Sequence, residues 1–254
     1  MSRVVPIKPP DPPTAVVTGG ASGLGEQIVR RLHSGGHRVA IADLDGAAAG
    51  RLARELAANH RDARGYPVDV ADPAALQNLF DAVHADFGEV QVLVNNAART
   101  QARPLLEITP GELDDVIRTN LNGTFAACQI FGARMAAAGY GRIVNLASLA
   151  GQNGGTATGG HYAASKGAIL SLTKVFAREL AARGVTVNAV SPGPLDSPMV
   201  RQIVHDVDAM AAAIPVGRLG SMAFIAEMVA LLVSPEAASV TGACWDANGG
   251  LYLR

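Results

Sequence analysis

The sequence predicts an α/β fold in which about seven parallel strands form one doubly wound sheet flanked by helices. Short apolar runs, such as the β-branched segment 14–18, alternate along the chain with longer segments that show helical spacing of apolar residues. Continuous apolar strands separated by helices indicate a parallel sheet that is covered on both faces. Because aromatic residues make up only 4% of the chain, we expect an aliphatic core.

The expected elements follow one another in a regular order. Strands are expected at 14–18, 38–42, 66–68, 90–94, 141–147, 185–190 and 243–246. Helices are expected at 24–32, 47–59, 73–87, 112–138, 161–183 and 223–233. Asp72 and Pro73 are expected to cap and open the third of these helices. Sheets of this kind bind ligands at the carboxyl ends of their strands, so the turns that follow the strands are the places to look for a site.

The domain organisation is simple. Residues 1–13 carry five prolines, which lack the backbone donor that a helix or central strand needs, and we expect an extended N-terminal arm there. No second change in composition follows, which predicts a single domain over residues 14–254.

Composition excludes several classes of partner. A net charge of −1 gives no reason to expect nucleic acid or an anionic membrane. The two cysteines are too few for a disulfide framework, and nothing at the N-terminus has the pattern of a secretion signal. The chain also lacks the stretch of about 18 apolar residues that a membrane span requires. We expect a cytoplasmic protein with no metal site.

A glycine-rich turn follows the first strand directly, with the sequence Thr18-Gly19-Gly20-Ala21-Ser22-Gly23-Leu24-Gly25. Glycines let backbone N–H groups approach a pyrophosphate, and the helix that follows offers its positive N-terminus. The alternative is that this glycine-rich turn only reverses the direction of the chain and binds nothing. Its position between a strand and a helix favours dinucleotide binding.

The spacing of this turn resembles the T-G-x-x-x-G-x-G pattern of the short-chain dehydrogenase/reductase family. The resemblance covers nearly all residues from Thr14 to the C-terminus and implies a Rossmann-type fold that binds a nicotinamide dinucleotide. The coenzyme contacts that it implies in this turn are Gly19, Ser22, Gly23, Leu24 and Gly25.

Asp43 ends the second strand, 18 residues beyond Gly25. A carboxylate at this point can accept hydrogen bonds from the adenosine ribose hydroxyls, and it would repel a 2′-phosphate. Leu44 follows it, where a phosphate-preferring site would have Arg. Asp43 could instead be a helix N-cap, because Asp43 and Asp45 both precede a helix. These residues favour NAD over NADP.

Further coenzyme contacts are implied by the resemblance alone. The Asp69 side chain and the Val70 backbone would contact the adenine, although Asp69 could equally be an ordinary turn carboxylate. The segment 95–98 is similar to the family's N-N-A-G, with Ala98 in place of glycine, and would contribute Asn96 and Ala97. The segment after the sixth strand would meet the nicotinamide through Pro192, Gly193, Leu195 and Ser197.

Tyr162 and Lys166 lie four residues apart, which places them on one face of a helix. A free phenol, with a pKa of about 10, gives up its proton too reluctantly to act near neutral pH. A neighbouring ammonium group lowers that pKa, so the phenol could exchange a proton with a substrate hydroxyl. Such a pair can also decorate any helix surface.

Ser148 and Asn120 complete the family's Asn, Ser, Tyr, Lys set in the family's order. The resemblance implies that Ser148 binds the substrate oxygen, Tyr162 moves the proton and Lys166 also holds the nicotinamide ribose. Asn120 would hold a water through helix-backbone geometry and complete a proton relay. Without the family context, Ser148 would be a strand-end turn residue and Asn120 a helix-surface amide.

One departure concerns the loop before Tyr162. Fourteen positions separate Ser148 from Tyr162, one more than is commonest in the family, and the glycine-rich segment 151–160 can absorb the extra residue. That loop should border the substrate.

His161 stands beside Tyr162, but adjacent helical residues point about 100° apart, so we expect it to serve packing or to lie at the rim.

The sequence leaves the substrate open. Segment 195–214 is expected to form a mobile lid of mixed apolar character that carries Arg201 and His205, and Arg99 and Arg103 lie just past the fourth strand. This combination suits a ketone of moderate size that has an apolar body, with or without a negative group. Each arginine alone could equally be a solvated surface charge. The favoured hypothesis is an NAD-dependent enzyme that interconverts a small secondary alcohol and a ketone. The alternatives are an NADPH-dependent 3-oxoacyl reductase, acting on carrier-protein or coenzyme A thioesters, and a catalytically silent nucleotide-binding regulator.

The resemblance also implies a homotetramer. Ala126, Ala127, Gly132 and Ala133 on the long helix would permit close helix packing between subunits, and Trp245 could join a second interface.

Overall fold

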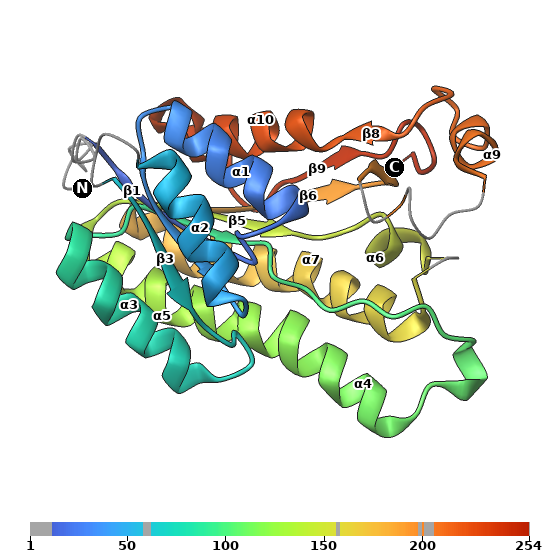
Figure 1. The fold of residues 1–254 in the computed structure, drawn as a ribbon, viewed down its shortest axis with the longest axis horizontal. Coiled ribbons are helices and arrows are strands. Elements are labelled where there is room, and N and C mark those ends of the chain that lie inside the picture. The colour runs from blue at the N-terminus through green and yellow to red at the C-terminus, as the bar shows by residue number, and fades with distance from the viewer. Residues whose placement is uncertain (1–11, 58–61, 156–157, 198–199, 201–205, 254) are drawn as a thin grey trace.

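A computed structural model describes residues 12–57, 62–155, 158–197, 200 and 206–253. Seven parallel strands form its main sheet in the order β3-β2-β1-β4-β5-β6-β9 (Figure 1). Chain order reverses beside β1, which pairs with β2 on one side and with β4 on the other. The predicted single-domain, doubly wound architecture is therefore confirmed. Ligands of such sheets bind outside the strand ends next to this reversal.

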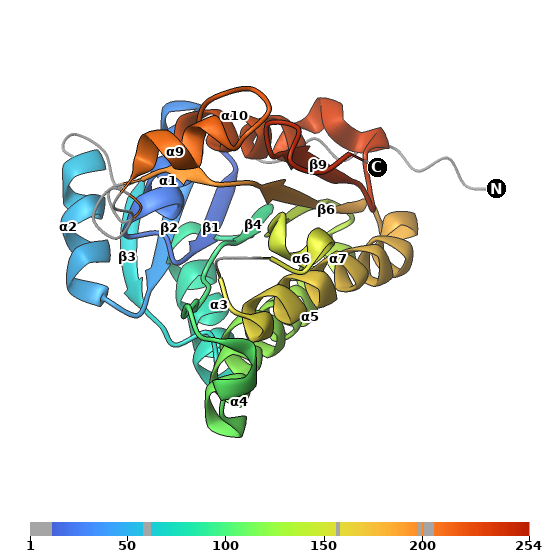
Figure 2. The same ribbon diagram turned by 90° about the vertical axis from the view of Figure 1, so that its right-hand side faces the viewer.

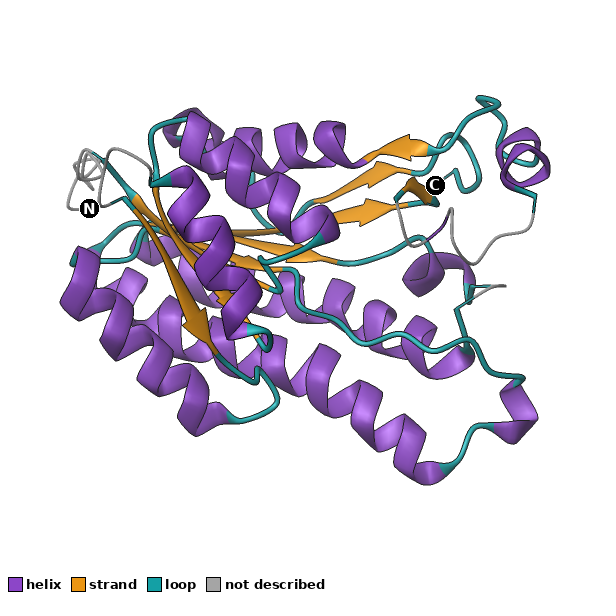
Figure 3. Cartoon of the chain, in the orientation of Figure 1, coloured by secondary structure: helices purple, strands orange, loops and turns teal. Residues whose placement is uncertain are grey.

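The strands lie close to their predicted positions. Their bounds are β1 (Thr14–Thr18), β2 (Arg38–Asp43), β3 (Ala63–Pro67), β4 (Val92–Asn95), β5 (Gly141–Leu146), β6 (Val185–Pro192) and β9 (Cys244–Ala247). A separate two-stranded pair, β7 (Leu195–Asp196) with β8 (Gly220–Ser221), was not expected from the sequence. It forms because the chain after β6 runs beside the segment that precedes the last long helix (Figure 3).

Helices cover both faces of the sheet (Figures 1 and 2). One face carries α1 (Gly23–Ser34), α2 (Gly46–Leu56) and α10 (Met222–Val233), and the other carries α3 (Pro73–Phe87), α5 (Gly123–Ala138) and α7 (Gly160–Leu180). Asp72 caps α3 by accepting from the Ala74 backbone N–H, and Pro73 is its first residue, as predicted. Shorter helices are η1 (Leu105–Glu107), α4 (Pro110–Ile117), α6 (Ala150–Asn153), η3 (Ala181–Arg183), α9 (Val207–Ala212) and η4 (Pro235–Ser239).

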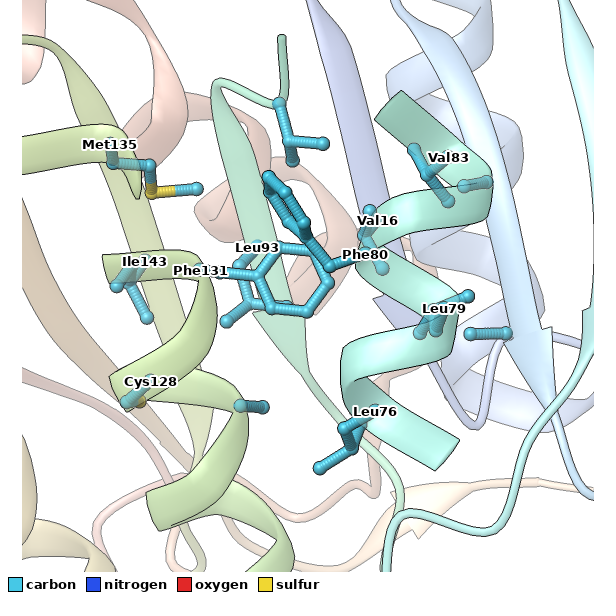
Figure 4. Close-up of a cluster of buried hydrophobic side chains, with 14 of the residues drawn as sticks. Val16, Leu76, Leu79, Phe80, Val83, Leu93, Cys128, Phe131, Met135 and Ile143 are labelled. Atoms are coloured by element: carbon cyan, nitrogen blue, oxygen red, sulfur yellow. The ribbon is translucent and has the colours of Figure 1, made fainter. Parts of the chain in front are cut away.

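Two apolar layers hold the sheet between its helices. Figure 4 shows one of them, where α3 and α5 meet over the strands and the Phe80 and Phe131 rings pack edge to face at 5.3 Å. The opposite layer is almost purely aliphatic and joins α1, α2 and α10 to the sheet. Burying apolar surface on both faces stabilises a parallel sheet, and it leaves the strand ends as the accessible edge.

The predicted helix 112–138 is wrong as a single α-helix. Instead, α4 and α5 are joined by a π-helical segment, η2 (Arg118–Asn122). Rare π-helical turns insert an extra residue into a helix and are frequent at functional sites. Amino-acid propensities do not distinguish this turn from the α-helix around it, so the sequence pattern could not reveal it.

The remaining expectations concern regions that the structure describes only in part. Most of the proline-rich arm, residues 1–11, lies outside the described residues, as do Arg201 and His205. Within the described part of the chain, no helix combines the length and apolar character that a bilayer-crossing segment requires. Nor do those residues contain a group of three or more His, Cys, Asp or Glu side chains placed to hold a metal ion.

Candidate active site

The glycine-rich turn is as tight as its sequence suggests. Gly19 and Gly23 have φ angles of 61° and 54°, in the left-handed region that side chains disfavour. Gly25 approaches the turn so closely that an added Cβ would lie 1.9 Å from the Gly19 carbonyl oxygen. These positions therefore require glycine, and the turn opens directly into helix α1.

Asn96 holds this turn in place. Its Nδ2 donates to the carbonyl oxygens of Thr18 and Gly19, at 3.1 and 2.9 Å. The Thr18 hydroxyl in turn accepts from the backbone N–H groups of Asn96 and Ala97. The end of β4 is thus fastened to the end of β1. Ala98 adopts no left-handed conformation, so the alanine in place of the family's glycine introduces no backbone strain.

Asp43 does not cap the following helix. Asp45 performs that function by accepting from the Ala48 backbone N–H, whereas the Asp43 carboxylate accepts from the N–H groups of Ala21 and Asp45, both at 3.0 Å. These two bonds fix the orientation of the carboxylate beside the turn. The helix-cap alternative for Asp43 is therefore excluded.

A cavity of about 570 Å³ extends along the carboxyl ends of β1, β2 and β4. Asp69 is exposed at its edge and also accepts from the Ala71 backbone N–H, so it is a turn carboxylate that faces the cavity as well. The predicted coenzyme residues that line this cavity are Gly19, Ser22, Gly23, Leu24, Gly25, Asp43, Asp69, Val70, Asn96 and Ala97.

A smaller cavity of about 160 Å³ continues from Leu24 and Asn96, which line both. Ser148, Tyr162 and Lys166 share its wall with predicted nicotinamide contacts, namely Pro192, Gly193 and Leu195. The structure thus brings the Ser148 side chain, just after the end of β5, together with the Tyr162 and Lys166 side chains of α7 at one end of the two cavities. Ser197 is not among the residues that line either cavity, and its hydroxyl accepts from the Val200 backbone N–H.

Burial determines the pKa values of Lys166 and Tyr162 in the smaller cavity. The Lys166 ammonium is buried, donates to the Leu146 carbonyl at 2.5 Å and lies 5.6 Å from the Tyr162 ring centre. Desolvation lowers the pKa of Lys166 to about 8. Burial raises the pKa of Tyr162, and the neighbouring Ser148 hydroxyl in the same cavity wall counteracts this rise. The Lys166 ammonium is held at the Leu146 carbonyl rather than at the phenol, and burial is the largest influence on the pKa of Tyr162.

Asn120 is buried inside η2 and is not a helix-surface amide. Its side chain accepts from the Arg99 backbone N–H at 2.7 Å and donates to the Arg99 carbonyl and to the Ser165 hydroxyl. The Thr124 hydroxyl donates to the Asn120 carbonyl at 2.7 Å. The π-helical turn therefore ties the segment after β4 to helix α7, which carries Tyr162.

Two further expectations can be compared with the structure. His161 is buried, in agreement with the packing function expected for it. The exposed arginines pair with carboxylates of α4: Arg103 lies 2.7 Å from Glu112, and Arg99 lies 3.9 Å from Asp115. Both arginines are therefore already engaged by charges of the chain itself.

Sequence reasoning missed a buried polar network beneath the site. Asn95 Nδ2 donates to the Asn145 side-chain oxygen at 2.8 Å, and Asn145 Nδ2 donates to the Thr173 hydroxyl at 3.0 Å. The Cys128 thiol contacts both asparagines, and burial raises its pKa to about 12. The available signal was Asn145 inside the predicted strand 141–147 and Asn95 directly after the strand 90–94, because buried amides require partners.

The fold and this arrangement of side chains define an oxidoreductase of the doubly wound, dinucleotide-binding class. A family profile described as Enoyl-(Acyl carrier protein) reductase matches residues 19–252. The chain is 37% identical to 3-oxoacyl-[acyl-carrier-protein] reductase FabG of Escherichia coli (strain K12), over 94% of this chain and 97% of the relative. It belongs to the short-chain dehydrogenase/reductase family.

Relatives with other names match equally well. The chain is 39% identical to 2-dehydro-3-deoxy-L-rhamnonate dehydrogenase (NAD(+)) of Sphingomonas sp. (strain SKA58), over 93% of this chain and 94% of the relative. It is 37% identical to D-threitol dehydrogenase of Mycolicibacterium smegmatis, over 96% of this chain and 94% of the relative. Family membership thus fixes the type of chemistry, while the names of the relatives cover several substrates.

Proposed function

We propose that this protein is an NAD(H)-dependent dehydrogenase that interconverts a small secondary alcohol and the corresponding ketone. The observation that carries the proposal is the cavity in which Ser148, Tyr162 and Lys166 meet Gly193 and Leu195. When bound, the nicotinamide ring would supply or accept the hydride. The side chains around it have the separate tasks of binding the substrate oxygen and moving its proton.

Each residue has a distinct part in the proposed reaction. The Ser148 hydroxyl donates a hydrogen bond to the substrate oxygen. Tyr162 takes the hydroxyl proton during alcohol oxidation as a phenolate, which the Lys166 ammonium would stabilise once it moves away from the Leu146 carbonyl. Lys166 would leave the Leu146 carbonyl to hold the nicotinamide ribose. The backbone of η2 at Asn120 would hold the water that relays the proton outwards. Proton transfer by a positioned side chain contributes about 10²- to 10⁴-fold to such reactions.

The test is a screen of secondary alcohols and ketones with both coenzymes, followed by nicotinamide absorbance. The proposal requires reversible turnover of at least one alcohol and ketone pair. The first compounds to try are polyols and sugar acids, because relatives of this chain are named for a threitol and for a rhamnonate derivative. Absence of turnover, with coenzyme binding intact, would favour a nucleotide-binding regulator.

A second candidate is an NADPH-dependent reductase of 3-oxoacyl groups on a carrier protein or coenzyme A. The match to 3-oxoacyl-[acyl-carrier-protein] reductases over nearly the whole chain favours it. A 3-oxoacyl thioester belongs in the same screen, and faster reduction of that thioester with NADPH than of any ketone with NADH would favour this candidate.

We predict that the wild-type protein prefers NAD, and that Asp43→Asn reduces the ratio of kcat/KM for NAD to that for NADP by about 10- to 100-fold. The carboxylate is oriented by two backbone N–H groups at the cavity wall and would bind ribose hydroxyls while repelling a 2′-phosphate. Charge-assisted hydrogen bonds contribute about 1.5–3 kcal/mol, which is the origin of this range.

The matched control for this substitution is Asp45→Asn. Asp45 caps α2 two residues further on and does not line the cavity, so its variant should keep the coenzyme ratio. A wild-type preference for NADP would contradict the assignment, as would equal ratios in the wild type and in Asp43→Asn.

We also propose a homotetramer in the cytoplasm. The small residues expected to serve subunit contacts mostly do not: Ala126, Ala127 and Gly132 are buried within the chain itself. The outer face of α5 and α7 instead carries exposed Phe125 and Val175, which supports helix packing between subunits. The chain has only two cysteines, too few for a disulfide framework, which suits a reducing compartment.

Light scattering of the purified chain should give four times the monomer mass of 26.1 kDa. Phe125→Glu should lower that mass, because it places a charge on the apolar face. The control is Leu106→Glu, which replaces another exposed apolar residue, located on η1 outside that face. A monomeric wild type would contradict the proposed assembly.

A further inference from the structure

Gln152 joins the short helix α6 to the edge strand β9. Its Nε2 donates to Asp246 Oδ1 at 2.7 Å, across 94 residues of sequence. A carboxylate acceptor makes this bond charge-assisted and therefore stronger than a bond between neutral groups. The Gln152 amide oxygen is buried and has no hydrogen-bond partner among the described residues. Gln152 Nε2 also lies 3.8 Å from Cys244 Sγ on the same strand, a weaker acceptor, so the bond to Asp246 is the stronger polar attachment of this side chain to β9.

Helix α6 depends on contacts of this kind. It has four residues, Ala150–Asn153, and helices shorter than about 12 residues have little stability of their own. On its other side, Gly151 lies against α7 so closely that an added Cβ would be 2.5 Å from the Lys166 backbone carbon. The helix is therefore positioned between α7 and β9, and Gln152 supplies the attachment to β9.

The orientation of the Ser148 hydroxyl depends on α6 in turn. Its Oγ accepts from the Ala150 backbone N–H at 3.2 Å, and its carbonyl accepts from the Gly151 N–H at 2.9 Å. Ser148 is thus bound to the first turn of α6. A displacement of α6 would rotate this hydroxyl away from Tyr162.

We propose that Gln152 is a positioning residue: its hydrogen bond to Asp246 holds α6 against β9 and so keeps the Ser148 hydroxyl at the cavity wall that it shares with Tyr162. This inference rests on the proposed dehydrogenase function. Gln152 does not line the cavity that contains Ser148 and Tyr162, so it acts through α6 and touches neither substrate nor coenzyme.

The experiment compares Gln152→Ala with the wild type in alcohol oxidation. We expect kcat to fall about 5- to 20-fold, the KM for NAD to stay within about twofold, and the pH at which kcat/KM is half-maximal to rise. The fall corresponds to loss of about one hydrogen bond. The rise follows because the nearby Ser148 hydroxyl lowers the pKa of Tyr162, and its displacement would leave the effect of burial unopposed.

Two conservative variants keep the test decisive if Gln152→Ala folds poorly. Asp246→Asn retains an acceptor oxygen for the Gln152 amide and should keep most of the activity. Gln152→Glu places two carboxylates together, and because they repel each other when both are ionised, this variant should lose more activity at neutral than at acidic pH. The titratable groups that face these positions are Asp246 and Cys244 on β9 and, near the phenol, Lys166 on α7. Because these groups titrate in the wild type as well, the pH profile of kcat/KM of each variant is compared with that of the wild type, and only the difference is assigned to Gln152.

Gln77→Ala is the matched control. It removes a similar bond, from Gln77 Nε2 to Asp81 at 3.0 Å, on the exposed surface of α3, and it should leave kcat and the pH profile unchanged. An unaltered kcat and pH profile in Gln152→Ala would overturn the inference, even if the melting temperature fell. A wild type that oxidises no alcohol with either coenzyme would overturn the proposed function instead.

Discussion

Tyr162→Phe is expected to reduce kcat by about 10²- to 10⁴-fold while leaving NAD(H) binding nearly unchanged. The substitution removes only the phenolic oxygen, which the proposed reaction needs both as base and as acid. The ring itself still lines the cavity with Ser148 and Lys166, so the nucleotide site keeps its shape. Turnover is measured by nicotinamide absorbance, and binding of NADH by its change in fluorescence.

Tyr66→Phe is a suitable control for this substitution. Tyr66 is buried and its hydroxyl donates to Asp86 at 2.6 Å, but it lies on β3 and lines neither cavity. Its variant should lose some stability and keep kcat. A Tyr162→Phe protein that retained more than about a tenth of wild-type turnover would contradict the assignment of Tyr162 as the proton-transfer residue.

Lys166→Met is expected to abolish turnover and at the same time to stabilise the fold. The wild-type ammonium is fully buried, and desolvation lowers its pKa from 10.5 to about 8. A shift of this size corresponds to on the order of 3 kcal/mol of destabilisation near neutral pH. Loss of the bond to the Leu146 carbonyl offsets about 1 kcal/mol, which leaves a rise of a few degrees in the melting temperature.

The pH dependence of this stabilisation has a definite sign. Between pH 8 and pH 10.5 the unfolded wild type binds more protons than the folded protein, so wild-type stability rises with pH across that window. The advantage of Lys166→Met should therefore be greatest below pH 8 and should decline as the pH approaches 10.5.

Lys174→Met provides the control, because Lys174 is exposed two turns later on the same helix. It should change neither activity nor the pH dependence of stability appreciably. A Lys166→Met protein with a lower melting temperature than the wild type at pH 7 would contradict the argument from burial.

The order of strands and helices could be predicted from the sequence, because the spacing of apolar residues indicates which face of each element is buried. Strand β1 matches its prediction residue for residue, and α3 begins at the predicted cap. Elements that depend on long-range contacts could not be predicted in this way. The pair of β7 and β8 has two residues in each strand, and α6 is held by Gln152 and by contact with α7, none of which leaves a periodic signal.

The residues of the candidate site could be predicted from the sequence where their spacing is local, but their long-range contacts could not. The glycine turn, Asp43, Tyr162 and Lys166 have local spacing that reflects their chemistry, and the structure brings them to one continuous pair of cavities. The position of the Lys166 ammonium at a backbone carbonyl was not predictable, because it depends on the packing of α7 against β5. The burial of the Asn120 side chain, which the resemblance placed in the catalytic set, was not predictable for the same reason: its partners lie 21 and 45 residues away.

The π-helical turn η2 has a consequence for changes in chain length. Deleting one residue from an α-helix rotates everything beyond it by about 100° and normally destroys packing. Within Arg118–Asn122, removing one residue would instead allow a continuous α-helix from α4 into α5, since a π turn holds one residue more than an α turn. A shortened chain of this kind should still fold. It would lose the geometry that buries Asn120 against Arg99, and natural sequences that differ here by one residue should lack an amide at this point.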